Sequence, residues 1–471
     1  MGEGIFKGSI VRVINPLFKS KKDLLYLGFV FPQVWINFIT TFLQDSAPLS
    51  TEITYFSRGG FALLVALILI VRKPSSDKTF SSLTWPFVSL AIIAPFLTTF
   101  NPFGYSQVAI VIGTIFAGIG VTWEYLLYFH VYSKLDAKQI IGYILLSYSL
   151  AAIVRIPMNM LSSEASILAS AVVLIAGAVL AQKALEHARK NPYSPEVSSS
   201  AYGNFKKFIP VVVEMIIYGV IIGLLRYMSE ESWSDGAAWF INQVLRIIVP
   251  LILLWWFLLL KRSINISNLL QIALLIVVTA LLVISFFDDP ASPPANVASI
   301  TAKTVITILL WIALALIAQQ SKLHPYIVFG VGWGLFRISI AFGMVLTEAI
   351  GNTTVFTDTL ALNLVYLVVI STVFVLVLRN EERGNLAGNK KNKVKENLDF
   401  LDSRCEEIGK ANNLTKREIE VMQYICKGRS KSYIAKALSI SEHTVRGYSK
   451  TLYAKLNVHS IQEILSLVGI N

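Results

Sequence analysis

Near the C-terminal end of the chain, polar and basic side chains recur at helical spacing. Within 442–456, the residues Thr444, Arg446, Tyr448 and Lys450 occupy exposed positions of an expected helix. A helix fits the major groove of DNA, where Arg and Lys bind guanine O6 and N7 and Thr or Val methyls meet the thymine methyl. Nearby lysines would bind phosphates, which position a protein without specifying a sequence. The candidate DNA contacts are Lys431, Thr444, Val445, Arg446, Tyr448, Ser449, Lys450 and Lys455.

Four short helices are expected to position these side chains. Thr415 and Glu418 form a capping box that begins the first helix, and Gly428 is placed to end it. Ser441 caps the third helix. The second, third and fourth helices are expected over roughly 431–438, 442–456 and 461–468. Two short helices, a tight turn and a helix with an exposed polar face predict a helix-turn-helix. From residue 413 onward the sequence contains nine Lys and Arg but only four Asp and Glu, and this positive excess favours a polyanionic partner.

This segment resembles the LuxR/GerE-type DNA-binding domain. The matching residues are Leu414, Thr415, Arg417, Glu418, Val421, Gly428, Ile434, Ala435, Leu438, Ser441, Thr444, Val445, Tyr453, Lys455, Leu456 and Val458. The resemblance implies that the third helix enters the major groove and that the fourth forms a homodimer on a two-fold symmetric operator. The chain departs from the family at Tyr448, where His is usual, at Thr451, where Asn is usual, and at Ile461, where Arg is frequent. A small helical bundle without a role on DNA is the alternative.

The composition of the whole chain is that of a membrane protein. Hydrophobic residues make up 55 % and charged residues 15 % of the sequence, and the mean hydropathy is +0.62. We predict twelve apolar spans, each long enough to cross roughly 30 Å of hydrocarbon in a lipid bilayer. They cover about 24–43, 53–71, 83–100, 105–129, 139–157, 164–182, 207–228, 236–260, 268–287, 300–320, 325–347 and 357–378.

The charges of the connecting segments alternate. Every second connection carries Lys or Arg, whereas the other six carry none. These six are 44–52, 101–104, 158–163, 229–235, 288–299 and 348–356. By the positive-inside rule both termini are therefore cytoplasmic in a multi-pass protein of the inner membrane. A C-terminal domain that binds DNA must lie on the same side.

The expected fold class is all-α. The long basic connection 183–207 divides the spans six and six, which is typical of the two six-helix halves of major-facilitator proteins. The connection between the second and third spans lacks the Gly-Asp-Arg-Gly-Arg pattern that is typical of transporters with that fold. The predicted domains are an N-terminal half over 1–182, the central loop over 183–207, a C-terminal half over 208–378, a linker with a short amphipathic helix over 379–412 and the LuxR-type domain over 413–471.

Charged residues also lie within the predicted spans, where a charge costs at least a few kcal/mol and usually faces a cavity or a partner. They include Arg58, Glu124, Arg155, Glu214, Arg226, Arg246, Lys303 and Arg337. Arg246 and Arg337 lie near the centres of their spans and favour a cationic pocket. For Arg58, Arg155, Arg226 and Lys303, which lie near span ends, a structural role is favoured: Arg155 and Arg226 would snorkel to the interface, and Glu–Arg pairs would be structural. The candidate pocket comprises Arg246, Arg337, Glu214, Arg155, Glu124 and Trp333, for a small anionic or aromatic ligand.

Other chemistry finds no support in the sequence. It contains no Walker-type phosphate loop, no metal-ligand spacing of Cys or His, and no hydrolase or kinase signature. We therefore expect neither an enzyme nor a cofactor or metal. The two cysteines, Cys405 and Cys426, are expected to be structural and not disulfide-bonded in a cytoplasmic segment.

These observations predict a membrane-embedded, one-component transcription regulator that senses a small molecule between its six-helix halves. Similarity to multi-pass LuxR-type regulators of gut bacteria implies a small, often aromatic, ligand. One alternative is a secondary transporter with a regulatory DNA-binding tail. Another is a membrane anchor that sequesters the tail until proteolysis within 379–412. In that linker an apolar heptad seam over 394–408 either assists dimerisation or packs on its own domain.

Overall fold

The computed structural model is helical throughout the residues that it describes, and no strand occurs among them. These residues are 17–18, 20–36, 50–72, 82–98, 107–190, 201–229, 236–259, isolated positions between 269 and 279, 293–321, 323–350 and 400–468. The chain divides into two compact units, Met1–Val375 and Leu376–Asn471.

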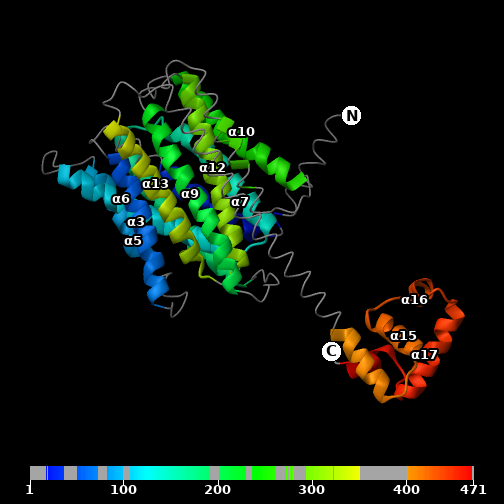
Figure 1. Ribbon diagram of the computed structural model, residues 1–471. Helices are drawn as coiled ribbons and strands as arrows, with labels where there is room; N and C mark the ends of the chain where they lie inside the picture. Colours follow the sequence, from blue (N-terminus) through cyan, green and yellow to red (C-terminus); the bar gives the residue numbers. More distant parts are fainter. Residues whose placement is uncertain are drawn as a thin grey trace. The chain divides into compact units, whose positions relative to one another are not determined.

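The first unit is a bundle of long apolar helices (Figure 1). Its elements are η1 (Lys21–Phe29), α3 (Ser50–Val71), α5 (Thr84–Thr98), α6 (Gln107–Tyr132), α7 (Ala137–Met158), α8 (Ser163–Lys190), α9 (Ala201–Ser229), α10 (Gly236–Leu259), α12 (Pro293–Gln320) and α13 (Pro325–Ile350). Within the described residues, seven helices are long and apolar enough to cross a membrane: α3, α6, α7, α8, α10, α12 and α13. Shorter apolar helices lie over Thr84–Thr98 and Phe208–Leu224.

The observed helices differ from the predicted spans at the first span and at the central connection. The first span opens as the 3₁₀ helix η1, and only 30–36 is described beyond it. The central connection is shorter than predicted, because α8 continues to Lys190 through residues with high helix propensity and α9 begins at Ala201. Of the predicted span 268–287 the structure describes only isolated positions, and 357–378 lies outside the described residues.

Helices that are distant in sequence pack against one another in this unit. α13 packs on α3 and on α9, while α7 packs on α10. α9, α12 and α13 run side by side (Figure 1). At the α3–α13 contact, a Cβ added to Gly59 would lie 2.7 Å from the carbonyl oxygen of Gly334. Such a clash means that only glycine permits this approach, and the two backbones are in direct contact there.

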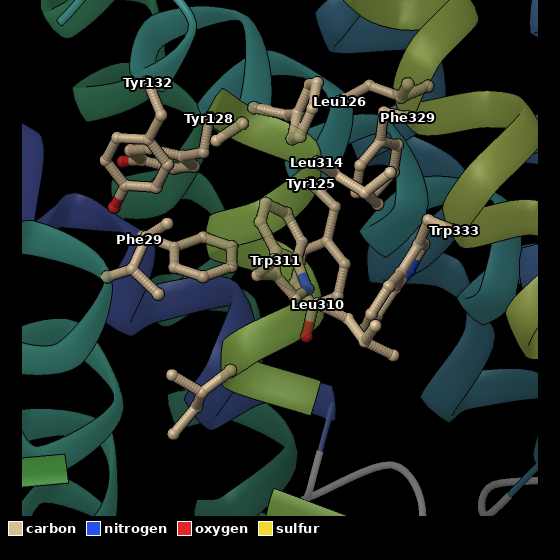
Figure 2. Packing of buried hydrophobic residues seen from close by; sticks show 14 of the residues in the cluster. Phe29, Tyr125, Leu126, Tyr128, Tyr132, Leu310, Trp311, Leu314, Phe329 and Trp333 are labelled. Carbon is tan, nitrogen blue, oxygen red and sulfur yellow. The ribbon is translucent and has the colours of Figure 1, made fainter. Parts of the chain in front are cut away.

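Aromatic side chains fill the centre of the bundle. Trp311 of α12 is fully buried, and its ring centroid lies 4.6 Å from that of Phe29, 4.9 Å from that of Phe329 and 5.3 Å from that of Trp333. Tyr125 of α6 meets the edge of the same indole at 5.5 Å. Figure 2 shows Trp311 among these rings. Because edge and tilted ring pairs add to the gain from burial, this cluster fixes how α6, α12 and α13 face one another.

The second unit begins its described part with a helix over 400–411. It continues with α15 (Lys416–Cys426), α16 (Lys431–Leu438), α17 (Glu442–Leu456) and α18 (Ile461–Val468). The predicted helix signals are confirmed. The Thr415 hydroxyl accepts from the Glu418 N–H while the Glu418 carboxylate accepts from the Thr415 N–H. Gly428 takes a φ of 69° after α15, and the Ser441 hydroxyl caps α17 by accepting from Thr444.

A separate hydrophobic core holds this unit together. Val421, Ile434, Leu452 and Ile464 are completely buried, one from each of α15 to α18. Cys405 on the helix over 400–411 enters the same core. This part of the linker therefore packs on its own domain, which was one of the two expectations, whereas the start of the heptad seam lies outside the described residues.

Candidate functional site

The exposed face of α17 carries the predicted recognition side chains. Thr444, Arg446 and Lys450 are exposed. The Thr444 N–H is bound to the Ser441 hydroxyl at 3.1 Å, which holds the first turn of α17 in place. Lys431 is exposed at the start of α16, the preceding helix. These four side chains can reach a groove and its phosphates without changing the core.

Two of the predicted DNA-contacting residues, Val445 and Ser449, lie on the buried face of α17. Val445 is fully buried and Ser449 is 3 % exposed, so neither is available to a base edge. The Ser449 hydroxyl donates to the Val445 carbonyl at 2.8 Å. Together with Leu452 and Leu456, these residues form the inward stripe of α17, because positions three and four apart share one helix face. The prediction that Val445 and Ser449 contact DNA is corrected.

Two further candidates also take part in contacts within the domain. The Lys455 ammonium donates to the Glu418 carboxylate at 2.8 Å and to the Asn413 carbonyl at 3.1 Å. Burial alone would raise the pKa of Glu418, but hydrogen bonds from Lys455 and Thr415 outweigh it and lower that pKa. Tyr448 is half-buried and packs on the hydrophobic core. Lys455 therefore joins the end of α17 to the start of α15.

The cysteines of this unit form no disulfide. Cys405 and Cys426 are both buried free thiols. A hydrogen bond between them lowers the pKa of Cys405 and raises that of Cys426. The two thiols thus pack as small hydrophobic residues at the contact between the 400–411 helix and α15.

In the membrane unit, Arg337 lies inside the bundle as expected. It is 7 % exposed on α13. Its guanidinium carbon lies 4.2 Å from the ring centroid of Trp333, one turn earlier, and 5.2 Å from that of Tyr55 on α3. The ammonium of Lys303 on α12 donates to the Tyr55 hydroxyl at 3.0 Å. Tyr55 therefore lies between two cations.

Arg58, which the sequence places near the end of a span, is also buried within the bundle. It is 3 % exposed on α3, and its guanidinium carbon lies 5.0 Å from the ring centroid of Tyr125 on α6. The Tyr125 hydroxyl donates to the Gln33 side-chain oxygen at 3.2 Å. Arg58 was missed because its place near a span end does not reveal which helices enclose it. The neighbouring Gly59, which allows close packing, was the available signal.

A second pair of arginines lies where α7 meets α10. Arg155 of α7 donates through Nη2 to the Gln33 carbonyl at 2.9 Å, so it binds backbone within the protein. Arg246 of α10 is half-buried and lies within electrostatic reach of Arg155. Arg337 lies within electrostatic reach of Arg58, and Arg246 within that of Arg155, while Tyr125 and Tyr148 lie within reach of both Arg155 and Arg337. For Arg226, the structure describes the backbone but no side chain.

The predicted acidic residues Glu124 and Glu214 are also buried. Glu124 of α6 is fully buried, and neither of its carboxylate oxygens has a hydrogen-bond partner. Its carboxylate lies against α8, because a Cβ on Gly177 would come within 2.6 Å of Oε2. Glu214 of α9 is 4 % exposed. Among the described residues, no three His, Cys, Asp or Glu side chains are grouped to hold a metal ion.

Comparison with known families identifies the C-terminal segment. Residues 412–468 match the model of the bacterial regulatory proteins of the luxR family. This segment is a LuxR-type DNA-binding domain. A putative transcriptional regulator of Pseudomonas aeruginosa is 36 % identical to the chain over 63 residues, which are 13 % of this chain and 30 % of that relative. The chain thus covers less than a third of the relative's length, and the likeness is confined to the LuxR-type domain.

The helical bundle resembles solved transporters. The structure of the human organic anion transporter MFSD10 (TETRAN) has a TM-score of 0.54 and 11 % sequence identity, and the match covers 75 % of this chain and 98 % of that one. The structure of FucP, a major-facilitator transporter in the outward conformation, has a TM-score of 0.48 and 12 % identity, with 78 % and 99 % covered. At such identities a likeness shows fold alone. The chain joins a LuxR-type domain to a multi-pass membrane domain whose fold is similar to that of MFSD10.

Proposed function

We propose that the protein is a one-component transcription regulator of the inner membrane, in which a small molecule bound by the membrane domain controls how the LuxR-type domain occupies DNA. The observation that carries the proposal is the presence, on one chain, of an exposed recognition face on α17 and of buried arginines in the bundle. A membrane anchor alone does not need buried charges, because each costs free energy that a plain apolar span avoids.

The full topology forms part of the proposal. Twelve spans in two six-helix halves, with both termini in the cytoplasm, would place the LuxR-type domain where DNA is. The packing of α3 on α13 and of α7 on α10 supports it, since each contact joins an early span to a late one. A ligand that binds one arrangement of the halves more tightly would shift the population of the two arrangements.

On DNA, we propose that two copies of the LuxR-type domain bind a two-fold symmetric operator through α17 and pair through α18. Ile461 and Leu467 of α18 are exposed apolar residues that support such pairing. Recognition would come from Arg446 and Lys450, and Lys431 would bind phosphate. No catalytic step is needed in this scheme.

The proposal is tested by operator occupancy in living cells. Full-length protein is expressed with its neighbouring promoters, and promoter occupancy and transcription are measured across a panel of small anionic and aromatic compounds. A compound that changes occupancy in the native chain but has no effect with Arg446→Ala supports the regulator. No change in occupancy or transcription with any compound in the panel counts against it.

Transport is the second candidate, because the bundle shares its fold with transporters. Accumulation of a labelled inducer in vesicles, driven by a proton or sodium gradient, would support a transporter with a regulatory tail. Release of a soluble C-terminal fragment on induction would support the sequestering anchor instead.

A further inference from the structure

Two buried arginines, Arg58 and Arg337, lie on the helices α3 and α13, which pack against each other. Arg58 precedes Gly59 and Arg337 follows Gly334 by three residues, and these two glycines bring the helix backbones into contact. Each guanidinium lies within electrostatic reach of the other. Two like charges in a low-dielectric interior repel one another strongly, because little solvent screens them.

Aromatic rings occupy the faces of both guanidiniums. Tyr125 lies over Arg58, while Trp333 and Tyr55 lie over Arg337. Such contacts stabilise a cation but carry no negative charge and form no hydrogen bond along the edges of the guanidinium plane. Arg58 and Arg337 form no ion pair with any carboxylate in the part of the chain that the structure describes.

The edges of these groups are unused. Nε and Nη2 of Arg58 and Nε of Arg337 are buried without a hydrogen-bond partner. In a guanidinium, Nε and Nη2 lie along one edge, and a carboxylate binds such an edge with two parallel hydrogen bonds. A buried donor without a partner costs roughly 1–3 kcal/mol, and more when it is charged, so an anion there would relieve both the repulsion and the unmet donors.

We propose that Arg58 and Arg337 together bind the carboxylate of a small organic acid with a flat, apolar body. One carboxylate would lie between the two guanidinium edges and reduce their mutual repulsion. The rings of Tyr55, Tyr125 and Trp333 would flank the apolar body. Because Arg58 and Arg337 come from opposite sides of the α3–α13 contact, a bound carboxylate favours the arrangement that holds these helices together.

The regulatory meaning of this site rests on the proposed function, but binding at the site does not. The first experiment therefore uses purified full-length protein in nanodiscs of uncharged, zwitterionic lipid. Benzoate and cinnamate are the probes, and their neutral amides are the matched controls. Binding is followed by tryptophan fluorescence and by the thermal unfolding midpoint. We expect both carboxylates to bind and to raise the midpoint, and the amides to do neither.

Variants locate the binding. Arg58→Gln and Arg337→Gln should each weaken carboxylate binding at least tenfold, whereas Arg72→Gln, at the exposed end of the same α3, should leave it unchanged. Without probe, each of the two glutamine variants should unfold at the same or a higher temperature than the native chain, because a repelling charge is gone. A lower midpoint in both would show that the guanidiniums have a permanent ionic partner and would overturn the proposal.

Further outcomes separate the possible sources of the anion. If neither carboxylate binds in zwitterionic nanodiscs, the proposal that Arg58 and Arg337 bind a carboxylate is wrong. Loss of carboxylate binding when phosphatidylglycerol is added would show that a lipid phosphate takes the place of the small acid, which also overturns it. A carboxylate that binds through Arg58 and Arg337 but changes no transcription leaves the site standing and removes the proposed function. An inducer that still acts on both glutamine variants leaves the proposed function standing and removes the site.

Discussion

The contact between Glu418 and Lys455 yields a prediction that can be measured on the LuxR-type domain alone. The Glu418 side chain is 5 % exposed, and one of its oxygens accepts from the Thr415 N–H at 2.7 Å and from the Lys455 ammonium at 2.8 Å. Glu418→Gln keeps an oxygen acceptor but removes the charge. Hydrogen bonds to charged groups contribute roughly 1.5–3 kcal/mol and neutral ones about 0.5–1.5 kcal/mol. Part of this difference is offset because a neutral amide is less costly to bury.

We therefore expect Glu418→Gln to lower the free energy of unfolding by about 1–2 kcal/mol at pH 7. The assay is urea unfolding of the segment 393–471, which contains the separate hydrophobic core of this unit. Glu420→Gln is the matched control. Glu420 pairs with Arg417 at 2.6 Å, but its side chain is 42 % exposed, so its loss should cost only about 0.3–0.5 kcal/mol.

The dependence on pH provides the sharper test. The folded-state pKa of Glu418 is lower than its unfolded value, which is about 4.3 for a free Glu. Its stabilisation is thus fully present above that unfolded value and is lost as the pH falls through the lower folded value. The difference in the free energy of unfolding between the native domain and Glu418→Gln should disappear as the pH falls from the unfolded pKa to the folded pKa of Glu418. A gap that is the same at pH 7 and at pH 3, or an equal cost for Glu420→Gln, would refute the reasoning.

Three more predictions concern the recognition face and the bundle. Arg446→Ala should relax operator sequence preference at a cost of about 1–3 kcal/mol, while Arg404→Ala, exposed on the 400–411 helix, should leave a footprint unchanged. Gly59→Leu should lower the stability of the detergent-solubilised protein by about 1–3 kcal/mol through overpacking, in contrast to Gly60→Leu, whose added Cβ meets nothing within 4 Å. Glu124→Gln should raise the thermal midpoint, because it removes a buried carboxylate without hydrogen-bond partners; a lower midpoint would reveal an ionic partner.

The fold of the LuxR-type domain was predictable because its signals are local. The capping box of Thr415 and Glu418, the turn at Gly428 and the cap at Ser441 each act within a few residues. Which residues of α17 lie toward the core was harder to predict. Val445 and Ser449 lie on the inward stripe, yet a valine and a serine are equally compatible with a groove-facing surface until the packing of α15 and α16 on α17 is known.

Contacts over long sequence separations account for what the sequence did not predict. The partner of Lys455 lies 37 residues away in Glu418, so no spacing rule relates them. Hydropathy placed Arg58 and Arg337 inside apolar spans, but only the packing of α3 on α13 shows that their guanidiniums lie within electrostatic reach of each other. The anionic ligand was inferred from charge in the bilayer. The pairing that would hold it required the three-dimensional arrangement.

The glycine contact between α3 and α13 bears on how this domain can move. Where Gly59 and Gly334 meet, backbone lies on backbone and no side chain of either residue interlocks with the opposite helix. Around that point side chains do interlock: an added Cβ would lie 2.8 Å from Cγ1 of Ile338 at Gly59 and 2.9 Å from Cγ of Leu63 at Gly334, so each helix packs a side chain over the glycine of the other. Helices that interlock in this way move together as one rigid body. A group bound to either helix at this contact therefore acts on both.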